Sequence, residues 1–117
     1  MVSNAREASV FKAIDMILEG RSSGAMPLIA QLLQGGAEPY YVIAMLARQL
    51  RLVLVAQELN IMNLPWSEMV RRLGVPMEFA ARKTVEQARQ HSPSMIRAMY
   101  RQILETDLAI KRGELKE

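Results

Sequence analysis

Apolar residues recur at intervals of three and four positions along almost the whole chain, and strict alternation of apolar and polar residues is absent. This spacing places apolar side chains on one face of a helix, whereas a half-buried strand needs a period of two. Glycine and proline fall between the periodic blocks, where they separate one helix from the next. The sequence therefore predicts an all-α fold, a compact bundle of five to six helices in a single domain over residues 1–117.

Proline, glycine and serine set the expected ends of these helices. Pro39 and Pro93 suit the first position of a helix, and Ser92 is a good cap before Pro93. Gly74 closes a helix because glycine readily takes the left-handed conformation found there. Pro27 predicts a late start or a bend in the second helix, because it cannot donate a helical hydrogen bond. The predicted helices cover about residues 9–19, 25–34, 39–59, 66–73, 76–90 and 93–112.

The composition excludes several classes of protein. The 117 residues include no cysteine, so the chain has neither a disulfide nor a cysteine-ligated zinc site. The most apolar region, residues 40–59, is interrupted by Arg48, Gln49 and Arg51 before it reaches membrane-spanning length. The start of the chain is polar and lacks the apolar stretch of a signal peptide. We therefore expect a cytoplasmic protein with no membrane partner.

No constellation of residues predicts catalysis or cofactor binding. The single imidazole, His91, has no metal-binding partner four positions away, and the serines fall in predicted turns and caps. The glycine pair at residues 35–36 is followed by Ala37 and Glu38, which is the wrong chemistry for a phosphate loop. We expect no catalytic residue, no metal and no cofactor in this chain.

Aromatic and arginine side chains mark a candidate interface. Tyr40 and Tyr41 are adjacent on a predicted helix, so they face different sides and at least one is expected at the surface. Arg48 and Arg51 lie one turn apart on an apolar background in the same helix. Eleven of the 15 basic residues are arginine, which suits paired contacts at interfaces. These four side chains are candidates for contacts with a partner or for fixing the register between helices.

Asp107 is the one carboxylate expected on a packed helix face, since Ile103, Leu104 and Ile110 lie three or four positions away. Two pairings are open for it. One is a rim pair with Lys111, and the favoured one is a partly buried pair with Arg48 or Arg51. If that pair is deeply buried, removing one partner costs about 3–5 kcal/mol.

Residues 67–89 match the outline of a helix-turn-helix, with a short helix, a turn at residues 73–75 and a second helix. The second helix begins with Pro76, Met77 and Glu78, which do not read base edges. Direct sequence reading is therefore disfavoured, although a basic strip offers contacts to a DNA backbone, with a solvated face as the alternative. The strip consists of Arg71, Arg72, Arg82, Lys83 and Arg89.

Four stretches, taken in order, resemble the C-terminal domain of the delta subunit of bacterial DNA polymerase III. They are FKAIDMILEG at residues 11–20, LARQLRLVL at 46–54, RRLGVPMEFAARKTVEQARQHS at 71–92 and TDLAIKRG at 106–113. Each stretch is helical and modestly specific, so the order and spacing carry the resemblance. It extends from about residue 11 to residue 113.

The resemblance implies a non-catalytic helical domain of the clamp loader. In that family this domain joins the tau/gamma and delta prime subunits in a collar, and the subunit helps load the β sliding clamp onto primed DNA. Amino-terminal domains related to AAA+ ATPases contact the clamp, so we expect this chain to be a C-terminal fragment of a longer subunit. The holoenzyme is a DNA-directed DNA polymerase, a nucleotidyltransferase, and primer-template DNA is a further candidate partner. The alternative function is a helix-turn-helix DNA-binding domain over residues 67–89.

Overall fold

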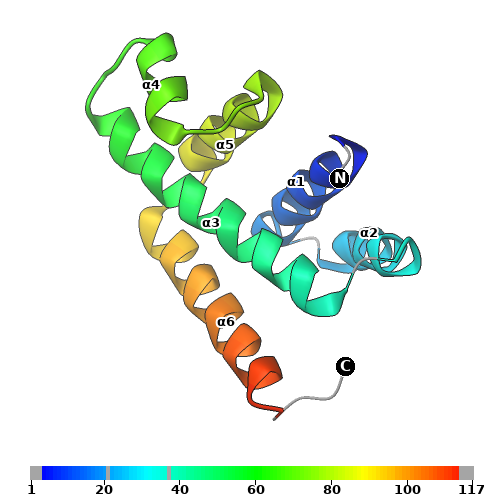
Figure 1. The fold of residues 1–117 in the computed structure, drawn as a ribbon. Helices are drawn as coiled ribbons and strands as arrows, with labels where there is room; N and C mark the ends of the chain where they lie inside the picture. Colours follow the sequence, from blue (N-terminus) through cyan, green and yellow to red (C-terminus); the bar gives the residue numbers. More distant parts are fainter. Residues whose placement is uncertain (1–3, 21, 37, 114–117) are drawn as a thin grey trace. The chain divides into compact units, whose positions relative to one another are not determined.

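The computed structural model describes residues 4–20, 22–36 and 38–113, and within these ranges it is helical with no strand (Figure 1). The prediction of an all-α fold is confirmed. The described helices are α1 (Asn4–Leu18), α2 (Ser22–Gln34), α3 (Pro39–Ile61), α4 (Trp66–Leu73), α5 (Glu78–Gln90) and α6 (Pro93–Lys111).

Three helix ends lie where the local chemistry places them. α3 begins at Pro39. The hydroxyl of Ser92 accepts a hydrogen bond from the backbone N–H of Met95 at 3.2 Å, which caps the first turn of α6. Gly74 closes α4 in the left-handed conformation, with φ of 69°. Local sequence chemistry therefore accounts for the start of α3, the end of α4 and the start of α6.

Two helices begin earlier than predicted. α1 begins at Asn4 rather than near residue 9, since the added turn contains alanine, arginine and glutamate, which favour helix. α2 begins at Ser22 rather than near residue 25, so Pro27 lies inside it. Proline removes one helical hydrogen bond at this point, and the side chain of Pro27 is exposed.

α5 begins later than predicted, at Glu78 instead of Pro76. Met77 has an extended backbone, with φ of −105° and ψ of 128°, so the helix cannot include the proline. The first turn then carries the carboxylate of Glu78, which complements the positive end of the helix dipole.

The described residues group into two compact units. Unit 1 comprises residues 1–47 and 101–117, and unit 2 comprises residues 48–100. The expectation of a single domain over residues 1–117 stays a prediction.

Unit 1 has an apolar core. Val10, Phe11, Ile14 and Leu18 of α1 are buried, as is Leu46 of α3. α1 packs against α2, and the two helices come close where Gly24 faces Met16. A Cβ atom at Gly24 would lie 3.1 Å from the sulfur of Met16, so the absence of a side chain there permits the approach.

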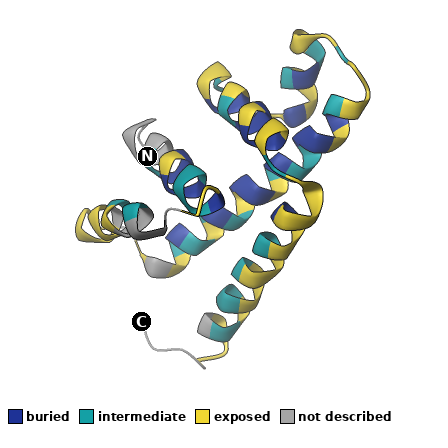
Figure 2. Cartoon of the chain, turned by 180° about the vertical axis from the view of Figure 1, so that it is seen from behind, coloured by how far each residue is buried: buried dark blue, intermediate teal, exposed yellow. Residues whose placement is uncertain are grey.

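Unit 2 combines an apolar core with buried polar side chains. Leu50, Val53 and Ala56 of α3 are buried, together with Leu73 of α4 and Val85 of α5. Figure 2 shows buried and exposed residues on opposite sides of these helices. The polar members of this core join α3 to α5, and they form the frame of the site described next.

Candidate functional site

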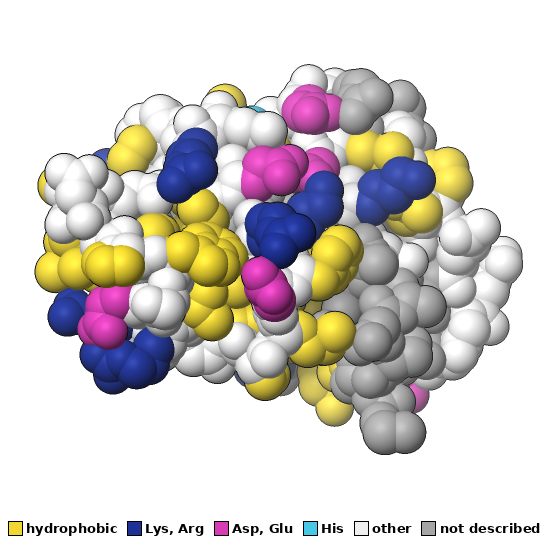
Figure 3. Space-filling model, turned by 90° about the horizontal axis from the view of Figure 1, so that it is seen from above, with side chains coloured by type: hydrophobic (Ala, Val, Ile, Leu, Met, Phe, Trp, Pro, Cys, Tyr) yellow, Lys and Arg dark blue, Asp and Glu magenta, His cyan; other side chains and the backbone are white. Residues whose placement is uncertain are grey.

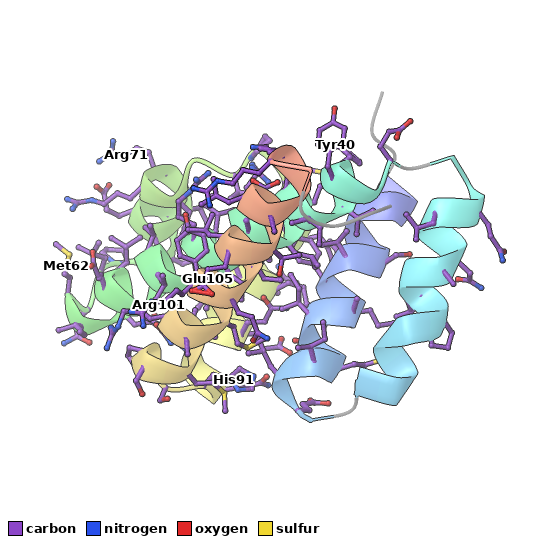
Figure 4. All side chains as sticks on the ribbon, turned by 90° about the horizontal axis from the view of Figure 1, so that it is seen from below. Tyr40, Met62, Arg71, His91, Arg101 and Glu105 are labelled. Atoms are coloured by element: carbon purple, nitrogen blue, oxygen red, sulfur yellow. The ribbon has the colours of Figure 1, made fainter. Side chains whose placement is uncertain are left out.

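The tyrosines at the start of α3 differ in exposure. Tyr40 is 50% exposed, and Figure 4 shows its side chain projecting away from the first turn of the helix. Tyr41 is half-buried. Of these two tyrosines, Tyr40 is therefore the more accessible to a partner.

Arg48 and Arg51 are both exposed on α3. Within the described part of the chain, neither guanidinium joins an ion pair. A planar guanidinium offers several N–H donors to a carboxylate. The structure thus leaves both arginines free for the contact role expected from the sequence, and that role stays a prediction.

Asp107 pairs within its own helix. Its Oδ2 lies 3.0 Å from Nζ of Lys111, one turn further along α6. Its Oδ1 is buried and has no hydrogen-bond partner among the described residues. The observed partner is therefore Lys111, the rim alternative. Pairing with Arg48 or Arg51, which belong to unit 2, stays a prediction.

The basic strip is largely compensated by acidic neighbours. Glu68 accepts hydrogen bonds from Arg71 and from Arg72, the latter at 2.9 Å, and these bonds lower the pKa of Glu68 from its usual 4.5 to about 2. Arg82 donates to Glu78 at 2.8 Å. On the face drawn in Figure 3, acidic side chains lie beside basic ones in several places.

The other two members of the strip, Lys83 and Arg89, differ in their acidic neighbours. Lys83 lies 4.0 Å from Glu86, a long ion pair. Arg89 is exposed and, among the residues that the structure describes, has no acidic partner. Charge compensation of this kind weakens attraction to phosphate, so contact between the strip and DNA stays a prediction.

The outline of a helix-turn-helix is present in α4, the turn at Gly74 and α5. The buried face of α5 includes Thr84 and Gln87, so these polar side chains cannot reach a base. Glu78 and Glu86 lie on the exposed face, where they oppose approach of a phosphate. The architecture therefore does not present Thr84 or Gln87 of α5 to DNA.

A buried polar network joins α3 to α5, and the sequence analysis missed it. The amide nitrogen of Gln49 donates to Oγ1 of Thr84 at 2.9 Å and to Oε1 of Gln87 at 3.1 Å. Thr84 donates in turn to the carbonyl of Ala80 at 2.8 Å. The exposed fractions of Gln49, Thr84 and Gln87 are at most 3%. Two glutamines eight positions apart in a long apolar helix were the available signal.

The second of these glutamines, Gln57, closes the end of α5. Its amide nitrogen donates to the carbonyl of His91 at 2.9 Å and to that of Ala88 at 3.4 Å. Carbonyls at the end of a helix lack hydrogen-bond donors within the helix, and the amide of Gln57 supplies the missing donor. Its position fixes the last turn of α5 against α3.

Next to this contact, unit 2 contains an open pocket of about 490 Å³. Its lining includes Gln57, Asn60 and Ile61 from α3, with Arg89 and His91 from the end of α5. Figure 4 places His91 between α5 and α6. Gln57 Oε1 and His91 Nε2 are buried, and neither has a hydrogen-bond partner among the described residues. We call this hollow the Gln57 pocket.

The described residues contain no group of three or more histidine, cysteine, aspartate or glutamate side chains placed to hold a metal ion. Among the described helices, none has the length and apolarity needed to cross a membrane.

Comparisons with known proteins identify a family by sequence and a similar fold by structure. A family model described as "DNA polymerase III delta subunit, C-terminal domain" matches residues 7–117. Among solved structures, the fold is similar to that of the DNA clamp loader delta protein of Bacillus subtilis, with a TM-score of 0.82 and 22% identity. That match covers 95% of this chain and 32% of the other, so this chain spans about a third of its length. No curated protein sequence matches the chain.

Proposed function

Because this chain belongs to the family of C-terminal domains of the DNA polymerase III delta subunit, we propose that it is the collar domain through which a clamp loader is assembled. Its partners are the tau/gamma and delta prime subunits. The subunit helps load the β sliding clamp onto primed DNA in the cytoplasm. Contact with the clamp itself is made by AAA+-related amino-terminal domains, and nucleotidyl transfer is carried out by other subunits of the holoenzyme.

The family match over residues 7–117 carries this proposal. The exposed side chains described above support it, because aromatic and arginine residues are enriched where proteins meet. Tyr40, Arg48 and Arg51 have this chemistry and are accessible. A collar requires preformed helices that present such side chains, and it requires no catalytic group.

Light-scattering mass on a sizing column tests the proposal. The chain is measured alone and then mixed with the tau/gamma and delta prime collar domains from the same genome. We expect a stable mixed complex at concentrations on the order of 10 µM, where assemblies with micromolar or tighter affinity persist. The absence of any mixed complex, also with full-length partner subunits, would contradict the proposal.

Matched variants locate the interface. We expect Tyr40→Ala to weaken assembly by about tenfold or more, as truncation of an aromatic anchor does. Glu38→Ala is the control, because Glu38 is also exposed and lies two positions away. Equal effects of the two variants would place the interface elsewhere.

Binding to duplex DNA separates the collar from the helix-turn-helix alternative. A DNA-binding regulator binds duplex DNA alone, and its affinity falls steeply with salt. Because acidic residues compensate most of the basic strip, we expect at most weak binding by this chain alone. Tight, salt-sensitive binding that is lost in Arg89→Ala would favour the alternative function over residues 67–89.

A further inference from the structure

Trp66 is the first residue of α4 and lies on the buried face of that helix. Met69 and Leu73, three and seven positions later on the same face, are both buried. Trp66 is nevertheless 38% exposed. The indole therefore lies at the edge of the unit 2 core, where part of its apolar surface is open to solvent.

Beside Trp66, unit 2 contains a second open pocket, with a volume of about 280 Å³. Figure 1 shows α4 beside α5, and the two helices are in contact. The side chains that α5 contributes are three or four positions apart, so they share one face of the helix. We call this hollow the Trp66 pocket. Its lining consists of Trp66 from α4 and, from α5, Arg82, Val85, Glu86, Arg89 and Gln90.

The charges on this lining are balanced except at Arg89. Arg82 donates a hydrogen bond to Glu78 at 2.8 Å, and Glu86 lies 4.0 Å from Lys83. Arg89 is exposed, and the part of the chain that the structure describes gives it no acidic partner. An accessible indole and an accessible, uncompensated guanidinium therefore line the same pocket. Such a guanidinium binds a carboxylate through a charge-assisted hydrogen bond.

We propose that the Trp66 pocket binds an acidic segment of a partner protein, in which an apolar side chain contacts the indole and an adjacent carboxylate pairs with Arg89. Tryptophan and arginine are among the residues that contribute most to binding at protein interfaces. A volume of about 280 Å³ is just below the range typical of small-molecule sites, so it suits one anchoring side chain better than a whole cofactor. The inference does not depend on the collar assembly, because it rests on contacts within unit 2.

The charges favour such a segment over a nucleic acid. A nucleobase could stack on the indole, but each neighbouring nucleotide brings a phosphate. Glu86 lines the pocket, and Glu78 lies next to it through its bond to Arg82. These carboxylates oppose a chain with a negative charge at every nucleotide. A segment with one carboxylate beside an apolar residue meets Arg89 without adding charge near Glu86.

Fluorescence titration tests the proposal, because the chain contains one tryptophan and its emission reports on Trp66 alone. The probes are the acetylated dipeptide amides leucine–aspartate, leucine–asparagine and glycine–aspartate. At concentrations up to roughly 50 mM, suited to millimolar affinity, we expect leucine–aspartate to change the emission of Trp66. Leucine–asparagine lacks the charge and glycine–aspartate lacks the apolar side chain, so each should bind more weakly by about threefold or more.

Two matched variants keep the test independent of folding. Arg89→Gln and Arg97→Gln both remove an exposed guanidinium from unit 2, but only Arg89 lines the Trp66 pocket. In Arg89→Gln, we expect leucine–aspartate and leucine–asparagine to bind equally, because the charge that distinguishes them no longer has a partner. Arg97→Gln should keep the preference for aspartate of about threefold or more.

Three results would overturn the proposal. The first is emission of Trp66 that leucine–aspartate leaves unchanged over the whole titration. The second is equal binding of leucine–aspartate and leucine–asparagine by the unaltered chain, or an equal loss of the preference in Arg89→Gln and Arg97→Gln. The third is a thymidine oligonucleotide that changes the emission at lower concentration than leucine–aspartate does, which would assign the pocket to a nucleic acid.

Discussion

Units 1 and 2 are held together in different ways. The described core of unit 1 consists of apolar side chains from α1 and α3, whereas all four buried polar residues of the described chain belong to unit 2. Apolar contacts depend on shape and volume and are not directional. The bonds of Gln49 and Gln57 to α5 require particular distances and angles. The difference indicates that hydrogen bonds add to apolar packing in fixing α5 on α3, whereas the described core of unit 1 relies on apolar packing.

The largest expected effect comes from removing volume in unit 1. Ile14 is 2% exposed, so Ile14→Ala should lower the free energy of unfolding by about 2–5 kcal/mol. Chemical denaturation of the variant measures this loss. Ile14→Val is the control, and because it keeps most of the volume we expect about 0.5–1.5 kcal/mol. Equal losses in the two variants would contradict a core set by volume.

A smaller loss should follow from breaking the polar network in unit 2. Gln49→Met preserves most of the volume but removes the donor to Thr84 and Gln87, so we expect a loss of about 1–3 kcal/mol. Adding Thr84→Val and Gln87→Met should restore part of it, because replacing all partners by apolar groups of similar shape is close to neutral. Gln90→Met on the exposed side of α5 is the control. A triple variant less stable than Gln49→Met would refute the network as the cause.

Asp107→Asn should have a still smaller effect. The observed pair with Lys111 is an i, i+4 contact on α6, and pairs of this kind contribute less than about 1 kcal/mol. Thermal unfolding of Asp107→Asn and Lys111→Gln measures it, and the two variants should agree. A loss of about 3–5 kcal/mol for Asp107→Asn alone would instead support the buried pairing with Arg48 or Arg51.

The smallest expected effect is at the surface of unit 2 and depends on pH. The pKa of Glu68 is lowered to about 2 in the folded chain and is near 4.5 when the chain unfolds. Glu68 therefore stabilises the fold above pH 4.5, and this contribution is lost as the pH falls toward 2. The difference in stability between wild type and Glu68→Gln should shrink over that range. A carboxyl titration near pH 4.5 in the folded chain would exclude the two arginine contacts.

Much of the fold could be predicted because helix ends depend on nearby residues. Pro39, Ser92 and Gly74 each act on their own turn, and the pair of Asp107 with Lys111 follows from spacing alone. The bond from Gln49 to Thr84 spans 35 positions, so it depends on how α5 lies along α3. Periodicity gives the buried face of each helix, but it does not give the alignment of two helices. The network and the Gln57 pocket therefore emerged only from the structure.

The paired caps around His91 have a consequence for protease sensitivity. Gln57 binds the carbonyls of Ala88 and His91 at the end of α5, and Ser92, the residue after His91, caps the first turn of α6. A protease needs an extended stretch of backbone, and these bonds oppose local opening at Arg89. Arg112 follows the end of α6 and is exposed. Trypsin should therefore cut after Arg112 well before it cuts after Arg89, which makes early cleavage at Arg89 a direct sign that Gln57 has released the end of α5.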